Sequence, residues 1–317
     1  MTRLTILHNT DLHGRAEQVL RIAALANEIK QEVEPGGGHC VLWDAGDAVE
    51  LNPPLLVKHT IIAQAGDYGR FLGQLELTLD SHTGKVVSYQ GTLLPVTDTL
   101  PIDPAARRAY EFQQVEVRKF TARVTGTATH PIDLAHDREC AAGNLLADAL
   151  RERMQGEVGL ALSGHWQSGL PNGEITMSAL YDACRSTANP GVAQLTGRQI
   201  RQFLQRALKP DNMQKSPNGV RGVPIGMPHV SAISVHYNPA QLDTLEVKIN
   251  HEPLQPARLY RVAASDMELS DFISYLTLPH ESITYELPTI MSEVLEDYLM
   301  RHSPIGPFDQ RFSFLGE

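Results

Sequence analysis

The hydrophobic residues at the start of the chain predict a strand, a helix and a second strand. Residues 4–8 form an apolar, β-favouring run. From about 15 to 34, apolar residues recur three and four positions apart, as on one face of a helix, and the glycine-rich stretch 35–38 ends it. A second apolar run covers residues 40–43. This order is typical of a βαβ unit with parallel strands.

The segment after residue 47 is too short for another such unit. Only twelve steps separate Asp47 from His59, whereas a βαβ unit takes about 30 residues. Residues 60–64 predict a short strand, and a hairpin follows with strands at 71–79 and 86–90. Residues 101–118 predict a connecting helix with its apolar side chains on one face: Ala105, Ala109, Phe112 and Val115.

The rest of the chain alternates strand and helix patterns, so we expect an α/β fold. Thr176 and Thr196 are placed to cap two helices. Residues 209–229 predict a long loop, because they are rich in Pro, Gly and Asn. The expected strands are 120–128, 158–162, 192–195, 233–237, 245–249 and 259–264. The expected helices are 139–154, 176–184, 198–208, 269–277 and 289–301. We predict a first domain over 1–100, a linker helix over 101–118 and a second domain over 119–317.

The amino-acid composition narrows the classes of partner that the protein is expected to bind. The chain has 317 residues, enough for two cores, and 27 basic against 37 acidic residues. This balance argues against a nucleic-acid or anionic-membrane partner. No apolar run approaches the roughly 18 residues of a membrane span, and no leader pattern precedes the first strand, so we expect a cytoplasmic protein. The three cysteines are expected to be reduced core residues: Cys40, Cys140 and Cys184.

Side chains that could bind a metal follow the first two predicted strands. Asp11 and His13 come directly after the first, and Asp47 after the second. Carboxylates and imidazoles are the ligands of a hydrolytic metal site. Open α/β sheets place their ligands beyond the carboxyl ends of the strands. His8, by strand alternation, is expected to be a satisfied strand histidine facing away from this group.

Six segments in order resemble the bacterial 5′-nucleotidase family, which includes UDP-sugar hydrolases and 2′,3′-cyclic-nucleotide phosphodiesterases. They are Leu7–Gly14, Asp44–Asp47, Gln64–Gly73, Arg138–Ala149, Gly173–Thr176 and Leu195–Gly197. The resemblance implies a calcineurin-like metallophosphoesterase domain followed by a mixed α/β 5′-nucleotidase C-terminal domain. It also implies a divalent metal such as Mn²⁺ or Zn²⁺, and nucleotides or related phosphoesters as substrates.

The first domain departs from the family pattern. The family's Gly-Asn-His segment is absent, and only Lys58–Ile61 resembles a later histidine motif. The domain is therefore expected to be truncated, with no identifiable catalytic residue. Asp11, His13 and Asp47, with His59 as a fourth ligand, suffice for one ion and are too few for two. The alternative is that no ion binds and that the two aspartates cap helices or turns.

The second domain departs as well. By the resemblance, Ser163 and Gln167 stand where the family has an Asn and a phosphate-binding Arg. His165 and Trp166 lie between them, and Trp166 either stacks on a base or sugar or fills the vacated cleft. The stretch 185–188 lacks the family's aromatic wall.

Two functions follow. The protein is a weak or inactive 5′-nucleotidase-like phosphoric-ester hydrolase, or a non-catalytic relative that binds a ligand or a partner through its C-terminal domain. A trimmed sheet has an exposed edge and an apolar face, and both favour a homodimer.

Overall fold

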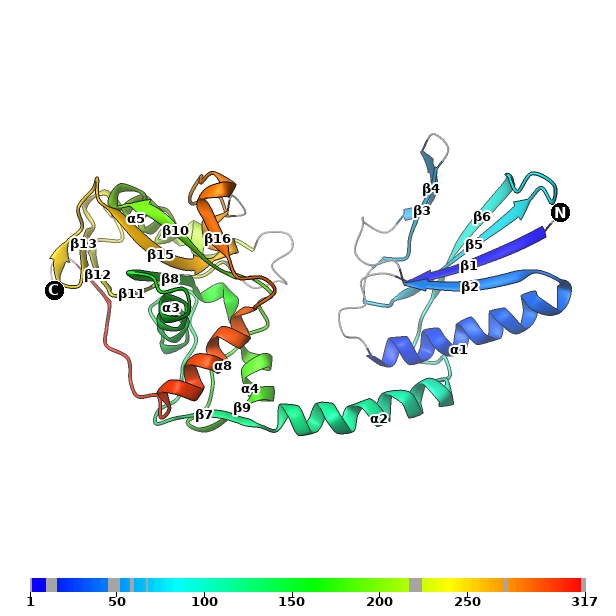
Figure 1. Ribbon diagram of the computed structural model, residues 1–317, viewed down its shortest axis with the longest axis horizontal. Coiled ribbons are helices and arrows are strands. Elements are labelled where there is room, and N and C mark those ends of the chain that lie inside the picture. Colours follow the sequence, from blue (N-terminus) through cyan, green and yellow to red (C-terminus); the bar gives the residue numbers. More distant parts are fainter. Residues whose placement is uncertain are drawn as a thin grey trace. The chain divides into compact units, whose positions relative to one another are not determined.

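The computed structural model describes residues 2–9, 16–44, 52–57, 60–66, 68–216, 224–270 and 273–314. The chain divides into two compact units, Met1–Arg118 and Lys119–Glu317 (Figure 1). In the described ranges no helix is both long and apolar enough to cross a membrane.

The first unit contains the predicted βαβ start. β1 (Thr2–Asn9) is parallel to β2 (His39–Asp44), and α1 (Ala16–Val33) connects them. The hairpin of β5 (Phe71–Leu79) and β6 (Val86–Pro95) extends the sheet antiparallel, in the order β2-β1-β5-β6. A separate hairpin joins β3 (Asn52–Val57) to β4 (Thr60–Gln64). A short 3-10 turn, η1 (Glu34–Gly36), ends α1.

The amphipathic face of α1 forms the core of this unit. Ile22, Ala26 and Ile29 cluster with Leu7 of β1 and Leu72 of β5. The periodicity was right for most of the helix but wrong at one position. The spacing of apolar residues predicts Val19 on the inner face of the helix, but Val19 is 42% exposed, whereas its neighbour Leu20 is buried.

Helix α2 (Pro104–Thr121) runs across the boundary between the units. Asp103 caps it, because its side chain accepts the Ala106 N–H at 2.7 Å, and proline at the first helical position suits a helix start. The predicted helix is present, but its apolar face is not covered: α2 has no buried residue, and Phe112 is 73% exposed.

A five-stranded mixed sheet organises the second unit, in the order β11-β8-β15-β10-β16. Its strands are β11 (Pro228–Ser231), β8 (Val158–Leu162), β15 (Leu259–Ser265), β10 (Pro190–Thr196) and β16 (Ile283–Tyr285). β8 and β15 are parallel, and the other neighbouring pairs are antiparallel.

Helices cover both faces of this sheet (Figure 1). Ala161 of β8 packs into one cluster with α3 (Ala141–Arg153), α4 (Met177–Ala183) and α8 (Met291–His302). Leu160 and Leu162 alternate into the opposite cluster, which contains α5 (Gly197–Ala207). The predicted caps are confirmed, since the Thr176 and Thr196 side chains accept the N–H groups of Ala179 and Gln199.

Two smaller sheets complete the unit. One has the order β14 (Glu252–Pro253), β13 (Glu246–Ile249), β12 (Ile233–Tyr237) and β17 (Phe312–Phe314). The other pairs β7 (Val124–Ala128) with β9 (Gly173–Thr176). The remaining short turns are η2 (Ser163–His165), η3 (Leu242–Thr244) and η4 (His280–Ser282).

Two predictions about irregular segments were wrong. The expected helix over 269–277 is absent from its described part, because α7 covers only Asp266–Leu269. Ser274 has φ 56, a left-handed value that cannot continue a helix, although its neighbours Ile273 and Tyr275 are buried in the core. The expected loop at 209–229 contains α6 (Pro210–Met213) and the start of β11.

Candidate functional site

All four predicted metal ligands lie outside the described residues: Asp11, His13, Asp47 and His59. The strands that lead to the first three are described. β1 and β2 are paired in parallel up to Asn9 and Asp44, so the two strands end at the same edge of the sheet. In the part of the chain that the structure describes, no three His, Cys, Asp or Glu side chains group as metal ligands would.

His8 is buried in β1, and one of its two ring nitrogens lacks a hydrogen-bond partner among the described residues. Its ring lies against Gly73, where an added Cβ would come within 2.1 Å of the His8 Nε2. The Nδ1 atom has no hydrogen-bond partner among the described residues. Burial lowers the pKa of this imidazole, so the neutral form is favoured.

The loop after β8, residues 163–169, buries the side chains of its first half. Ser163 and Trp166 are fully buried, His165 is 1% exposed, and Gln167 is exposed. The backbone is also engaged: the N–H groups of Ser163 and Gly164 donate to the carbonyls of Met227 and Ile225 at 3.0 and 2.9 Å. Those of Trp166 and Gln167 donate to Ser163 and Ala183. These four N–H groups are therefore not available to a ligand.

Trp166 belongs to the core that α3, α4 and α8 form with the sheet. Its indole is 0% exposed and clusters with Leu146, Ile175 and Leu180. The Nε1 donor has no partner among the described residues. Of the two interpretations, the geometry corresponds to a side chain that fills interior space.

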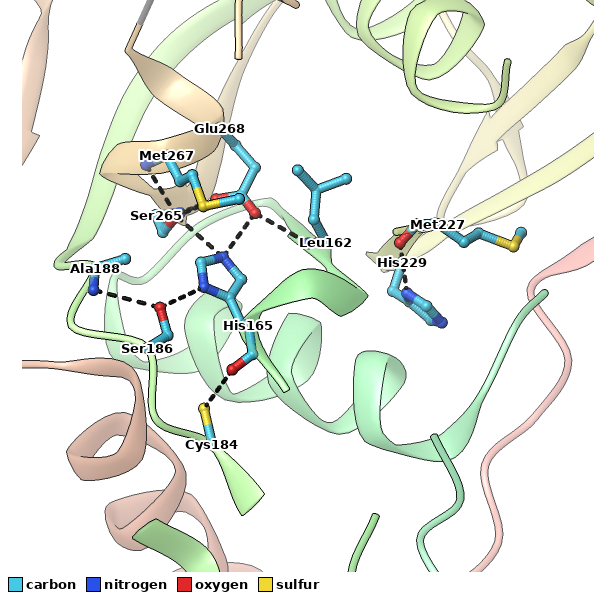
Figure 2. A network of polar contacts seen from close by, with 10 residues as sticks. All are labelled: Leu162, His165, Cys184, Ser186, Ala188, Met227, His229, Ser265, Met267 and Glu268. Carbon is cyan, nitrogen blue, oxygen red and sulfur yellow. Dashed lines mark hydrogen bonds and ion pairs between the residues drawn. The ribbon is translucent and has the colours of Figure 1, made fainter. Parts of the chain in front are cut away.

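His165 is held by a buried polar network (Figure 2). Its Nε2 lies 2.9 Å from Oε1 of Glu268 and 3.2 Å from Oγ of Ser265, and its Nδ1 lies 2.7 Å from Oγ of Ser186. Because a carboxylate only accepts, we infer that Nε2 carries a proton. His165 and Glu268 have no exposed side-chain surface.

Glu268 is the most fully bonded group of this network. It accepts hydrogen bonds from the backbone N–H groups of Leu162 and Ser265, at 3.0 and 2.9 Å, and from the Ser265 hydroxyl. Burial alone would raise the pKa of this carboxyl, but the neighbouring His165 and the Ser265 hydrogen bonds outweigh burial and hold it below its ordinary value. The carboxylate is therefore ionised and internally satisfied.

A second contact closes the start of the loop. The Ser163 hydroxyl lies 3.2 Å from Nδ1 of His136, whose pKa is lowered mainly by burial. Gly226 packs against both groups. It has φ 79, and an added Cβ would come within 2.1 Å of the Ser163 Oγ. Only glycine fits this close approach without strain.

Comparison with known proteins identifies the second unit. Residues 124–275 match the family described as "5′-nucleotidase, C-terminal domain". The matched segment lies within the second unit. The loop 163–169 and Glu268 both lie inside this matched segment.

Two curated relatives come from Bacillus subtilis (strain 168). The trifunctional nucleotide phosphoesterase protein YfkN is 26% identical over 183 residues, covering 54% of this chain and 12% of YfkN. The uncharacterized metallophosphoesterase YunD is 22% identical over 219 residues, covering 67% of this chain and 47% of YunD. The chain thus spans less than half the length of either relative.

Solved structures of 5′-nucleotidases share the fold. The 5′-nucleotidase precursor from Thermus thermophilus matches with a TM-score of 0.53 and 21% identity, over 81% of this chain and 52% of that one. The NAD nucleotidase NadN from Haemophilus influenzae gives 0.54 and 11%, over 93% and 69%. The predicted α/β fold class and the family resemblance are confirmed.

Sequence reasoning missed much of the network around His165. Ser265 and Glu268 form a capping box at the start of α7, and their spacing could have been read from the sequence. The partnership with His165 could not, because 103 residues separate His165 from Glu268. His136 and Ser186 carried no local signal.

Proposed function

We propose that the protein is a 5′-nucleotidase-like, metal-dependent phosphoric-ester hydrolase that acts weakly, or not at all, on nucleotides and related phosphoesters. The family assignment supports the reaction class. The observation that supports low activity is that Ser163, His165 and Trp166 are buried and that the N–H groups of Ser163, Gly164, Trp166 and Gln167 donate to carbonyls within the protein.

The metal part of the proposal rests on Asp11, His13, Asp47 and His59. Carboxylates and imidazoles suit a divalent ion such as Mn²⁺ or Zn²⁺, and four ligands suffice for one. The shared edge at which β1 and β2 end supports bringing the first three together. A divalent ion held there would supply Lewis-acid stabilisation to a phosphoryl group.

The loop is poorly equipped to hold a phosphate. Phosphate recognition uses cationic side chains and free backbone N–H groups. Of the candidate substrate residues, Ser163, His165 and Trp166 are buried. Gln167 is exposed but uncharged, and its backbone N–H donates to Ala183 at 2.7 Å.

The alternative function is a non-catalytic relative that binds a ligand or a second copy of the chain. The first unit supports this alternative, because its two edge strands carry exposed apolar side chains. Leu42 of β2 is 46% exposed, and Val87 of β6 is 59% exposed. Such patches on a sheet favour association, so a homodimer in the cytoplasm is part of this alternative.

Metal content and turnover of p-nitrophenyl phosphate, bis-p-nitrophenyl phosphate and 5′-AMP, measured for the wild type and Asp47→Ala, test the proposal. Asp98→Ala is the matched control, because the Asp98 side chain is 90% exposed. The hydrolase proposal predicts bound metal that Asp47→Ala alone removes, and any turnover of the wild type is expected to be slow and to be lost in Asp47→Ala alone. Equal metal content and turnover in all three proteins would contradict it and favour the binding protein.

A further inference from the structure

A pocket of about 510 Å³ lies at the start of α3, in the second unit, and it is separate from the His165 network. The segments 130–141 and 307–314 and the side chains of Asn144, Met227 and Tyr237 line it. This volume is within the range of small-molecule sites, about 300–1,000 Å³.

The walls of the pocket are aromatic. Tyr237 of β12 contacts two residues of β17: its ring centroid lies 5.4 Å from that of Phe314 and 6.2 Å from that of Phe312. Phe308 also lines the pocket. Phe314 is 48% exposed, so its ring is accessible from solvent. The faces of such rings attract cations.

The charge of the pocket is negative. Among its lining residues, four carboxylates accompany one guanidinium, that of Arg138: Asp133, Asp137, Glu139 and Asp309. Arg138 already lies 3.5 Å from Asp133 and 3.8 Å from Asp137. Burial, and to a lesser extent the charge of Glu139, raises the pKa of Tyr237.

The helix start does not offer an anion site here. The N–H of Cys140 donates to Nε2 of His229 at 3.0 Å. The N–H groups of Ala141 and Ala142 donate to the side chain and the carbonyl of Asp133, each at 3.0 Å. With these donors engaged, the first turn of α3 has little left to bind a phosphate or carboxylate.

One buried acceptor in the pocket lacks a partner. Asn144 is 3% exposed, and its Nδ2 donates to Glu139 at 2.8 Å. Its Oδ1 accepts no hydrogen bond from any described residue. An unsatisfied buried acceptor destabilises the protein, and a hydrogen-bond donor from a ligand would recover that loss. We propose that this pocket binds a small organic amine in its ammonium form, with an N–H group on Asn144 and the carbon skeleton between the aromatic rings.

Three probes with the same phenethyl skeleton separate the contributions of charge and of N–H donation to the binding affinity. Phenethylamine carries charge and N–H donors, its N,N,N-trimethyl analogue carries charge alone, and 2-phenylethanol carries neither charge nor N–H. Calorimetric titration of the full chain is expected to give phenethylamine at least about tenfold tighter binding than the alcohol. The trimethyl analogue is expected to bind at least about threefold more weakly than phenethylamine, because it cannot donate to Asn144.

Substitutions at two exposed positions test where the amine binds, and neither is expected to unfold the protein. Asp309→Asn is expected to weaken phenethylamine binding about two- to fivefold, as exposed charges do. Phe314→Ala is expected to weaken it by about threefold or more through loss of one wall. Asp243→Asn removes the same charge from an exposed position outside the pocket and should leave binding unchanged.

Three results would each overturn the proposal. The first is equal affinity for phenethylamine and 2-phenylethanol. The second is equal affinity for phenethylamine and its trimethyl analogue. The third is unchanged phenethylamine affinity in both the Asp309→Asn and the Phe314→Ala variant. Absence of binding at 10 mM, on the order of ten times a weak ligand's Kd, would do so as well. None of these results depends on hydrolase activity, so the amine site and the proposed function fail separately.

Discussion

The loop around His165 and the pocket beside Asn144 belong to the same unit but differ in whether their buried polar groups have hydrogen-bond partners. In the loop, the Glu268 carboxylate accepts hydrogen bonds from the backbone of Leu162 and Ser265 and lies 2.9 Å from His165. In the pocket, the Asn144 Oδ1 has no partner among the described residues. The difference teaches that one unit can satisfy the polar groups of a loop by internal hydrogen bonds and leave a buried acceptor without a described partner in a nearby pocket.

The largest effect is expected from breaking the His165 network. Glu268→Ala removes the carboxylate partner of His165 and the acceptor of the Leu162 and Ser265 N–H groups, so it should lower the free energy of unfolding by about 3–5 kcal/mol. Urea denaturation measures the change. The exposed Glu281→Ala serves as the control and should stay within about 0.5 kcal/mol. A loss of less than about 1 kcal/mol for Glu268→Ala would contradict a closed network.

Trp166 sharpens the same comparison. Trp166→Ala empties a fully buried site and should cost about 3–5 kcal/mol. Trp166→Phe keeps most of the volume and loses a donor without a partner among the described residues, so it should cost clearly less. Thermal unfolding of both variants measures the difference. If Trp166 were a ligand-stacking residue instead, Trp166→Ala would leave stability nearly unchanged and affect binding alone.

The buried His229 predicts a pH dependence. Burial lowers the pKa of His229 to about 4 from 6.5. Between these values the unfolded chain binds a proton that the folded chain does not, so the contribution is present above pH 6.5 and is lost as the pH falls toward 4. His229→Gln should flatten the slope of unfolding free energy in this window by about 1.4 kcal/mol per pH unit. An unchanged slope would show that His229 titrates normally in the fold.

The smallest effect is expected from restoring a cation to the loop. Gln167→Arg places a guanidinium at an exposed position, where the family resemblance implies a phosphate-binding Arg. Because the neighbouring N–H groups stay engaged, affinity for 5′-AMP should rise by no more than about fivefold. Gln167→Leu is the uncharged control. A gain of about a hundredfold, or 2.8 kcal/mol, would mean that the loop is an open phosphate site lacking only its charge.

Local patterns predicted the parts of the molecule that depend on neighbouring residues. Thr176 and Thr196 cap helices as expected, and the apolar run before Asn9 is a strand parallel to the one before Asp44. The predicted helix at 269–277 failed because Ser265 and Glu268 start a helix earlier and Ser274 takes a left-handed conformation. Apolar spacing does not report such a conformation.

The candidate site depends on contacts that span the chain, and these were beyond sequence reasoning. Ser163, His165, Trp166 and Gln167 follow one strand, so their common location was predictable. The burial of Ser163, His165 and Trp166 was not predictable, because it depends on the segment 225–227 and on α7, which are distant in sequence. The predicted metal ligands Asp11, His13, Asp47 and His59 stay a prediction, since they lie outside the described residues.

The accessibility of Trp166 tests most directly whether the loop is closed. The chain has two tryptophans, so acrylamide quenching of the Trp43→Phe variant reports on Trp166 alone. A closed loop predicts weak quenching that neither 5′-AMP nor phenethylamine changes. Strong quenching that 5′-AMP suppresses would contradict the account, because it would show an open loop in which Trp166 contacts a nucleotide.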